Sequence, residues 1–165
     1  MDQKRTNMSL DYKIAHSIDD VFELLTDPDF LVERSIGIGE DSADCEIEED
    51  ENGKIYITMN REVTRDLPSF LAKLFSAKQK LTMKETWQQV GSNWIGKGEY
   101  TVEGQPVNIT IDITLKSDGD GCVYSTKYAA KAKIPMIGGK VEKYIKGNCE
   151  DGTRAEMDFL AAKLG

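Results

Sequence analysis

The sequence lacks the features by which several classes of site are recognised. It has one histidine, His16, and its three cysteines, Cys45, Cys122 and Cys149, are far apart and form no C-x-x-C pair. A zinc site of Cys and His ligands is therefore not expected, and unpaired thiols of this kind indicate a reducing compartment. The chain also has no nucleophile elbow, phosphate loop or cluster of metal ligands. We expect neither a metal nor a cofactor.

Long hydrophobic runs and an excess of positive charge are also missing. No stretch approaches the length of a membrane span, and the first residues are polar without an apolar signal segment. We therefore expect a cytoplasmic protein with no integral membrane segment. Acidic residues outnumber basic ones by 29 to 21, which gives a net charge of −8. Nucleic acid is not an expected partner, because binding it requires clustered cations against phosphate.

The apolar content is ordinary for a folded protein of this size. Hydrophobic residues make up 39% of the 165 residues, enough for one domain with a packed core. No internal repeat or low-complexity linker divides the chain. We expect a single domain over residues 7–165, flexible residues 1–6, and a monomer.

The first forty residues predict a strand followed by two short helices. Apolar and polar residues alternate over Asn7–Ala15, which is typical of a strand. Ser17 then begins a capping-box pattern before an apolar helical segment. Asp27-Pro28 starts the second helix, because proline at the first helical position loses no hydrogen bond. Gly37 and Gly39 end that helix. His16, between the first strand and the Ser17 cap, is expected to be a surface or turn residue.

Strand patterns separated by turn signals fill the middle of the chain. Asn52-Gly53 is a strong hairpin signal, and Gly91, Gly104 and Asp118 begin three further turns. The expected strands are Asp44–Glu49, Lys54–Thr64, Gln79–Gln89, Asn93–Val102, Val107–Lys116 and Cys122–Lys133. Successive hairpins of this kind predict an antiparallel meander.

One connection, residues 66–75, is longer and predicts a short helix. Its apolar residues recur at helical spacing and would form one stripe. They are Leu67, Phe70, Leu71, Leu74 and Phe75. The segment is either a permanent flap over the core or a mobile lid at the mouth of a cavity, since long connections in compact domains are often functional.

The last strand leads into a long helix, about Gly138–Leu164, through Lys133-Ile-Pro-Met-Ile-Gly-Gly-Lys-Val-Glu-Lys143. Together with the strand order and the strand containing Trp87, this stretch resembles the START-like helix-grip superfamily (SRPBCC). That superfamily includes polyketide cyclase/dehydrase-like and lipid-transport-like proteins. Within it, the chain is most similar to an uncharacterised bacterial family.

This resemblance implies an α+β fold. A seven-stranded antiparallel sheet would wrap around the long C-terminal helix, with two short helices after the first strand. A hydrophobic pocket would lie between the sheet and the long helix. Members of the superfamily carry lipids, sterols, plant hormones or polyketides, and a few catalyse reactions.

Strand alternation and the resemblance together predict which side chains face the pocket. The expected ligand-binding residues are Met59, Arg61, Met83, Glu85, Trp87, Tyr100, Ile111, Tyr128, Tyr144, Asn148, Phe70 and Leu74. None is assigned a catalytic role, because nothing in their spacing requires one.

Arg61 and Glu85 are charged residues on otherwise apolar strand faces, and they are expected to lie diagonally across neighbouring strands. A buried charge needs a partner or water. One interpretation is a structural ion pair, or a bulge that turns Arg61 outward. The other is that Arg61 binds the carboxylate or phosphate head group of a ligand.

Small and aromatic residues at unusual positions suggest further features. Gly96 and Gly98 predict a bend in the strand or the close approach of a ligand or backbone. Trp87 and Trp94 would be cross-strand neighbours if Val90-Gly91 forms the turn, and would then plug the end of the hairpin. In the last helix, Gly147-Asn148 and Gly152 predict either room for a ligand or a helix that is kinked or broken there.

These observations favour intracellular binding or transport of a small hydrophobic ligand, such as a lipid, fatty acid, sterol or polyketide-like molecule. Two alternatives stay open: an enzyme of the polyketide cyclase/dehydratase or hydrolase type, and a protein-binding adaptor.

Overall fold

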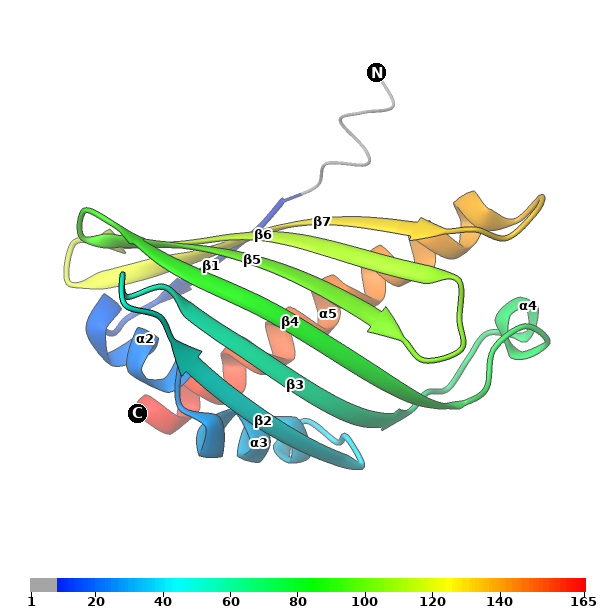
Figure 1. Ribbon diagram of the computed structural model, residues 1–165, viewed down its shortest axis with the longest axis horizontal. Helices are drawn as coiled ribbons and strands as arrows, with labels where there is room; N and C mark the ends of the chain where they lie inside the picture. The colour runs from blue at the N-terminus through cyan, green and yellow to red at the C-terminus, as the bar shows by residue number, and fades with distance from the viewer. Residues whose placement is uncertain (1–8) are drawn as a thin grey trace, which may run out of the picture.

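The computed structural model describes residues 9–165 and has the α+β architecture expected from the sequence. Its seven-stranded antiparallel sheet has the strand order β1-β7-β6-β5-β4-β3-β2. The sheet curves around the long C-terminal helix α5, and α2 and α3 lie beside the C-terminal end of that helix (Figure 1). Asn7 and Met8 of the expected first strand, and the expected flexible residues 1–6, lie outside the described part of the chain.

The elements follow the predicted order with small changes at their ends. The strands are β1 (Ser9–Ile14), β2 (Ser42–Glu49), β3 (Ile55–Thr64), β4 (Lys78–Val90), β5 (Asn93–Val102), β6 (Val107–Asp118) and β7 (Gly121–Ala132). The helices are α2 (Ile18–Leu25), α3 (Pro28–Gly37), α4 (Ser69–Ala72) and α5 (Gly138–Leu164).

The two short helices begin at the residues whose chemistry predicts it. The Ser17 hydroxyl accepts a hydrogen bond from the Asp20 amide at 3.1 Å. The Asp27 carboxylate accepts from the amide of Asp29 at 3.0 Å and that of Phe30 at 3.3 Å. Both side chains satisfy amide groups that the first turn of a helix leaves without partners. These helices then place Phe22 and Phe30 in the core.

The β4–β5 hairpin turns where the Gly91 signal predicts, and not at Val90-Gly91. Val90 pairs with Asn93, so the two-residue turn is Gly91-Ser92. Trp87 therefore lies opposite Gly96, and the expectation that Trp87 and Trp94 are direct cross-strand neighbours is wrong. Phe22 of α2 instead contacts both rings: it stacks on Trp94 with centroids 3.7 Å apart and meets Trp87 edge-on at 5.6 Å.

The glycines of β5 accommodate neighbouring side chains. A methyl group at Gly96 would lie 3.1 Å from the Trp87 ring, and one at Gly98 would lie 2.5 Å from Cγ2 of Ile111. Gly96 therefore gives the buried indole the space that a side chain would take. Neither glycine lines the cavity described below, so the close approach is between strands of the sheet.

Helix α5 runs without interruption from Gly138 to Leu164, so the alternative of two helices broken at Gly147-Asn148 is wrong. Its buried residues are Val141, Thr153, Met157 and Leu160. Hydrogen bonds join the helix to the sheet at two strands: the Tyr12 hydroxyl of β1 donates to Asp158, and the hydroxyls of Tyr128 and Thr153 bond each other.

The connection between β3 and β4 contains only one turn of helix, which is shorter than expected. Leu71 is buried, and Leu67, Phe70 and Phe75 pack partly against the core. Leu74 is 45% exposed, so it does not share the buried stripe that helical spacing predicted. The reason is that α4 ends at Ala72, and residues beyond it no longer follow the helical period. Whether the segment is a fixed flap or a mobile lid stays a prediction.

Candidate ligand-binding cavity

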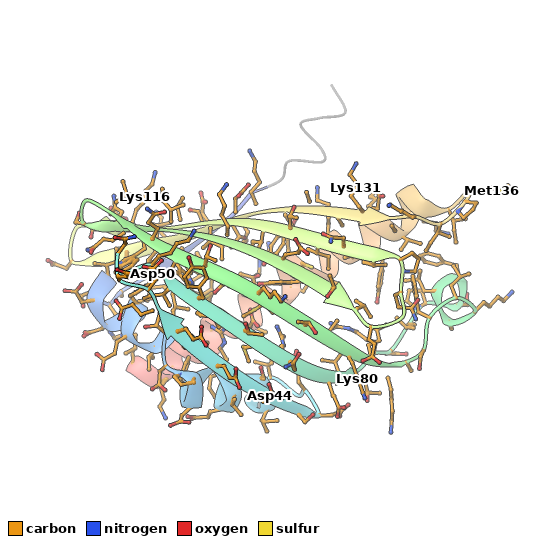
Figure 2. All side chains as sticks on the ribbon, in the orientation of Figure 1. Asp44, Asp50, Lys80, Lys116, Lys131 and Met136 are labelled. Atoms are coloured by element: carbon orange, nitrogen blue, oxygen red, sulfur yellow. The ribbon has the colours of Figure 1, made fainter. Side chains whose placement is uncertain are left out.

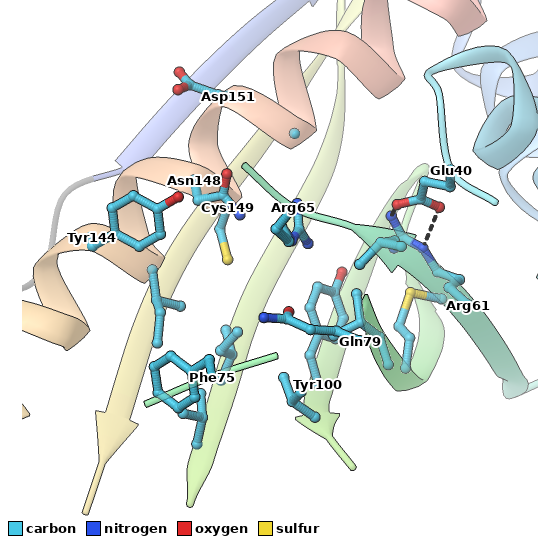
Figure 3. Close-up of a pocket in the computed structure, with 18 of the residues that line it drawn as sticks. Glu40, Arg61, Arg65, Phe75, Gln79, Tyr100, Tyr144, Asn148, Cys149 and Asp151 are labelled. Carbon is cyan, nitrogen blue, oxygen red and sulfur yellow. Dashed lines mark hydrogen bonds and ion pairs between the residues drawn. The ribbon is translucent and has the colours of Figure 1, made fainter. Parts of the chain in front are cut away.

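A cavity of about 380 Å³ lies between the inner face of the sheet and α5 (Figure 3). Its volume falls within the range of small-molecule pockets, about 300–1,000 Å³. Strands β3 to β7, the β3–β4 connection and α5 all contribute to its wall. The aliphatic and phenylalanine side chains of the lining are Ile38, Val63, Leu67, Leu71, Phe75, Leu81, Met83, Val102, Val107, Ile109, Ile145 and Ala155.

Six of the twelve residues expected to bind a ligand line this cavity. They are Arg61, Met83, Tyr100, Tyr128, Tyr144 and Asn148. The structure brings them together from four strands and one helix, as strand alternation and the position of α5 predict.

The other six lie elsewhere, for reasons that differ. Met59, Trp87 and Ile111 face the inner side of the sheet but are closely packed in the core, at most 2% exposed. Glu85 is buried beside Trp87, as described below. Phe70 contacts Tyr144 edge-on and has the Lys140 ammonium 4.0 Å from its ring centroid, and Leu74 is exposed. Alternation gives the face of a strand, but not the point along it where space is left open.

Arg61 forms an ion pair, although not with the residue that the sequence suggested. Its Nε donates to Oε1 of Glu40 at 2.8 Å, and its Nη2 donates to the other Glu40 oxygen. The same Nη2 lies 3.4 Å from Glu156 on α5, which also lies 3.8 Å from Nη2 of Arg34. Burial alone would lower the pKa of Arg61, but Glu156 and Glu40 outweigh it and raise the pKa.

Glu85 is not a partner of Arg61. In the β3–β4 register, Glu85 lies opposite Ile57 and Arg61 opposite Leu81, with the Met59–Met83 pair between them. This register is continuous, so no bulge turns Arg61 outward. The Trp87 indole Nε1 donates to Oε2 of Glu85 at 2.9 Å. Burial raises the pKa of Glu85 to about 7, although the Trp87 hydrogen bond and Arg34 act in the opposite direction.

Arg65 lines the cavity and was missed by the sequence prediction. The expected strand ended at Thr64, yet the inward alternation of Arg61 and Val63 continues to Arg65. Its backbone amide donates to the Ala77 carbonyl at 2.8 Å, which extends the β3–β4 pairing by one step. Continuing the period of two past the apolar residues would have found it.

Glu40 and Glu156 were also missed. Glu156 lies four residues after Gly152, so helical spacing from a predicted inner position would have found it. Glu40 lies in the loop between α3 and β2, where no periodic pattern indicates which way a side chain points.

The remaining polar groups of the cavity wall include the phenols of Tyr100 and Tyr128 and the thiol of Cys149. Burial raises the pKa of Tyr100 well above its usual value, and it raises that of Tyr128 as well. Both phenols therefore stay protonated near neutral pH and act as hydrogen-bonding groups. Burial also raises the pKa of the Cys149 thiol to about 12, with Arg65 acting in the opposite direction. Cys149 is thus not a ready nucleophile.

Residues 9–165 contain neither a metal-binding cluster nor a membrane-spanning helix. Within that part of the chain, His, Cys, Asp and Glu side chains nowhere gather in threes or more in a way that would hold a metal ion. No helix in the same range combines the length and apolar character needed to cross a membrane.

A comparison with known protein families shows which family the chain belongs to. The sequence profile of a family described as a protein of unknown function, DUF2505, matches residues 9–164. The chain belongs to this family. The resemblance to an uncharacterised bacterial family of the helix-grip type is thereby confirmed. No curated protein matches the chain in sequence.

Solved structures share the architecture of this DUF2505 member. A START superfamily protein from Mycobacterium smegmatis superposes with a TM-score of 0.61 at 12% identity, over 96% of this chain and 99% of that one. A STAR-related lipid transfer protein from Xanthomonas axonopodis gives 0.57 at 14% identity, over 94% and 84%. A protein from Thermus thermophilus gives 0.61 at 13% identity, over 94% of each chain. At these identities the similarity concerns the fold alone, and it confirms the expected START-like fold.

Proposed function

We propose that this protein binds a small hydrophobic molecule, of the lipid, fatty acid, sterol or polyketide-like class, in the cavity between the sheet and α5. The observation that carries this proposal is the cavity itself. It measures about 380 Å³, and most of the side chains around it are apolar or aromatic. Such a combination of an apolar wall and a few convergent polar groups is typical of ligand sites.

The energetics of an unfilled cavity support the same proposal. Empty apolar space costs on the order of 24 cal/mol per Å³, so a fully empty cavity of this size would cost about 9 kcal/mol. That is comparable to the whole stability of an ordinary domain. Water around the polar groups reduces the cost, but water gains little from the apolar wall. A hydrophobic ligand of fitting shape removes the remaining cost and stabilises the folded state by mass action.

The similarity to a STAR-related lipid transfer protein and a START superfamily protein supports the proposal through the fold alone. We further propose that the protein is a cytoplasmic monomer that carries its ligand within the cell. Size-exclusion chromatography with light scattering, before and after ligand addition, tests the oligomeric state.

No observation favours the enzymatic alternative to the same degree. The Glu85 carboxyl has a pKa suited to proton transfer at neutral pH, but it bonds Trp87 and does not line the cavity. We therefore assign no catalytic residue.

Two glycines of α5 allow a matched test. A methyl group at either Gly147 or Gly152 would meet no atom within 4 Å, but only Gly152 lines the cavity. Gly152→Leu therefore fills cavity space, whereas Gly147→Leu adds the same side chain to the exposed face of the same helix. Native mass spectrometry and thermal shift with fatty acids, phospholipids, sterols and flavonoids would measure binding.

We expect at least one class of ligand to raise the melting temperature of the wild type and of Gly147→Leu, and to lose this effect in Gly152→Leu. A wild-type protein that binds none of these classes would overturn the proposal. Equal binding by both variants would show that the ligand occupies another part of the molecule.

A further inference from the structure

We infer that the cavity contains a carboxylate-binding subsite formed by Arg65 and Asn148, and that the ligand is an amphiphile with a single carboxylate head group. This inference rests on the proposed function, because it identifies the polar end of a ligand bound in the same cavity. It also assigns head-group recognition to a different cation from Arg61.

The charges around the cavity show why Arg61 is not the binding residue. Arg61 and Arg34 lie against Glu40 and Glu156, so this group of four charges sums to zero. The Arg61 side chain is 12% exposed and that of Glu40 is 9% exposed. A ligand carboxylate at Arg61 would have to displace two protein carboxylates that are already in place, or add a third negative charge beside them.

Asp151 also lines the cavity, but its charge has a partner outside. Its carboxylate lies 3.3 Å from Nη1 of Arg154, and its side chain is 82% exposed. In Figure 3, Asp151 points away from the cavity on the far side of α5. It therefore contributes little to the potential inside.

Arg65 is the charged group of the wall that remains without a counterion. Over residues 9–165, its guanidinium takes part in no hydrogen bond or ion pair. The side chain is half-buried, so its charge is only partly hydrated. A desolvated cation without a partner is unfavourable, and an anion placed against it removes that cost.

Asn148 supplies a second, neutral group from the opposite wall. Its side chain makes no hydrogen bond to any residue that the structure describes, and it lies on the cavity next to Cys149. Arg65 and Cys149, the residue next to Asn148, line the same cavity. Figure 3 shows Arg65 and Asn148 extending into the same part of the cavity.

The charge of the site fits a carboxylate better than a phosphate. One guanidinium supplies a single positive charge, which balances the single negative charge of a carboxylate, and the neutral Asn148 amide adds hydrogen-bond donors but no charge. A phosphate monoester carries about −1.5 to −2 charges at neutral pH and has three strong acceptor oxygens. The side chains of Leu67, Leu71 and Phe75, from the adjacent β3–β4 connection, form an apolar wall for the rest of the molecule.

The experiment compares ligands that differ only in the head group. Isothermal titration at pH 7.5 would measure dodecanoic acid, dodecanol and dodecyl phosphate against the wild type, Arg65→Gln, Arg65→Lys and Lys131→Gln. Lys131→Gln is the control for lost surface charge, because Lys131 is exposed on the outer side of β7 (Figure 2). The melting temperatures of the ligand-free variants would show that each remains folded.

We expect the wild type to bind the acid about 10- to 100-fold more tightly than the alcohol, as charge-assisted hydrogen bonds in a half-buried site allow. Arg65→Gln should lose this preference while its affinity for the alcohol stays unchanged. Arg65→Lys should retain most of it, and Lys131→Gln should retain all of it.

The possible failures can be told apart. Equal affinity of the wild type for acid and alcohol would overturn the subsite and leave the proposed function standing. Tighter binding of the phosphate, lost in Arg65→Gln, would overturn the assignment to a carboxylate. No binding of any of the three would overturn the subsite, and the broader ligand screen described above would then decide the proposed function separately.

Discussion

Arg61 of β3 and Glu40 of the α3–β2 loop face each other with both guanidinium–carboxylate contacts made, one of them at 2.8 Å. This bidentate pair lies in the wall of the cavity and joins the sheet to the segment that follows α3. Glu156 of α5 lies against the same guanidinium at 3.4 Å. Three separate parts of the chain therefore meet at a single side chain.

Replacing Arg61 with methionine should destabilise the protein strongly. The change leaves the largely buried Glu40 and Glu156 without their shared cation, and breaking a buried pair in this way costs about 3–5 kcal/mol. Urea denaturation would measure the change in the free energy of unfolding.

Lys80→Met is the control for the loss of an exposed ion pair. Lys80 and Glu62 are 3.9 Å apart, and both side chains are more than half exposed. An exposed pair of this kind contributes at most about 1 kcal/mol. The double variant Arg61→Met/Glu40→Met should be more stable than Arg61→Met alone; additive losses would contradict the coupling.

Glu85 should make stability depend on pH between about 4.5 and 7. Burial raises its pKa from 4.5 to about 7 in the folded state, so the folded protein holds this proton over a range where the unfolded chain has released it. The free energy of unfolding therefore falls as pH rises through this window, by up to about 3 kcal/mol in total. Glu85→Gln keeps an acceptor for the Trp87 indole and removes the titration. We expect the melting temperature of Glu85→Gln to exceed that of the wild type more at pH 8 than at pH 5, and an equal difference at both pH values would rule this out.

Two glycine-to-alanine changes should have opposite effects. At Gly96 the new methyl group would lie 3.1 Å from the fully buried Trp87 ring, and overpacking of this kind costs about 1–3 kcal/mol. At Gly147 the methyl group meets nothing within 4 Å on the exposed side of α5, and alanine favours the helix by about 1 kcal/mol. Thermal unfolding of the two variants should shift in opposite directions. A stabilised Gly96→Ala would show that the indole has room to move.

The hydrogen bond between the hydroxyls of Tyr128 and Thr153 should show the cost of an unpaired buried group. Tyr128→Phe leaves the buried Thr153 hydroxyl without this partner, which we expect to cost about 1–3 kcal/mol. The double variant Tyr128→Phe/Thr153→Val removes both hydroxyls and should recover part of the loss. Chemical denaturation of the two single variants and the double variant gives the coupling energy. A double variant that loses the sum of both single effects would show that the two groups act independently.

The sequence was informative about elements and faces because the signals for both are local. Period-two alternation, the Ser17 and Asp27 caps and the turn at Asn52-Gly53 each depend on a few neighbouring residues. The same local patterns placed Met83, Tyr100 and Tyr128 on the inner face. At the β4–β5 hairpin the turn signal at Gly91 was right, whereas the pairing of Trp87 with Trp94 failed because it required a turn at Val90-Gly91, one residue earlier.

The sequence alone determined the order of the strands and helices, the antiparallel meander and the inward face of each strand, since these depend on hydrophobic periodicity and turn chemistry. Only the tertiary structure decided that Arg61 pairs with Glu40 and Glu156, that Phe22 fills the space beside Trp87, and that the open volume lies next to Arg65 and Asn148. These outcomes depend on which distant segments meet after folding. No local pattern records such contacts, because burial and charge pairing are properties of the packed chain as a whole.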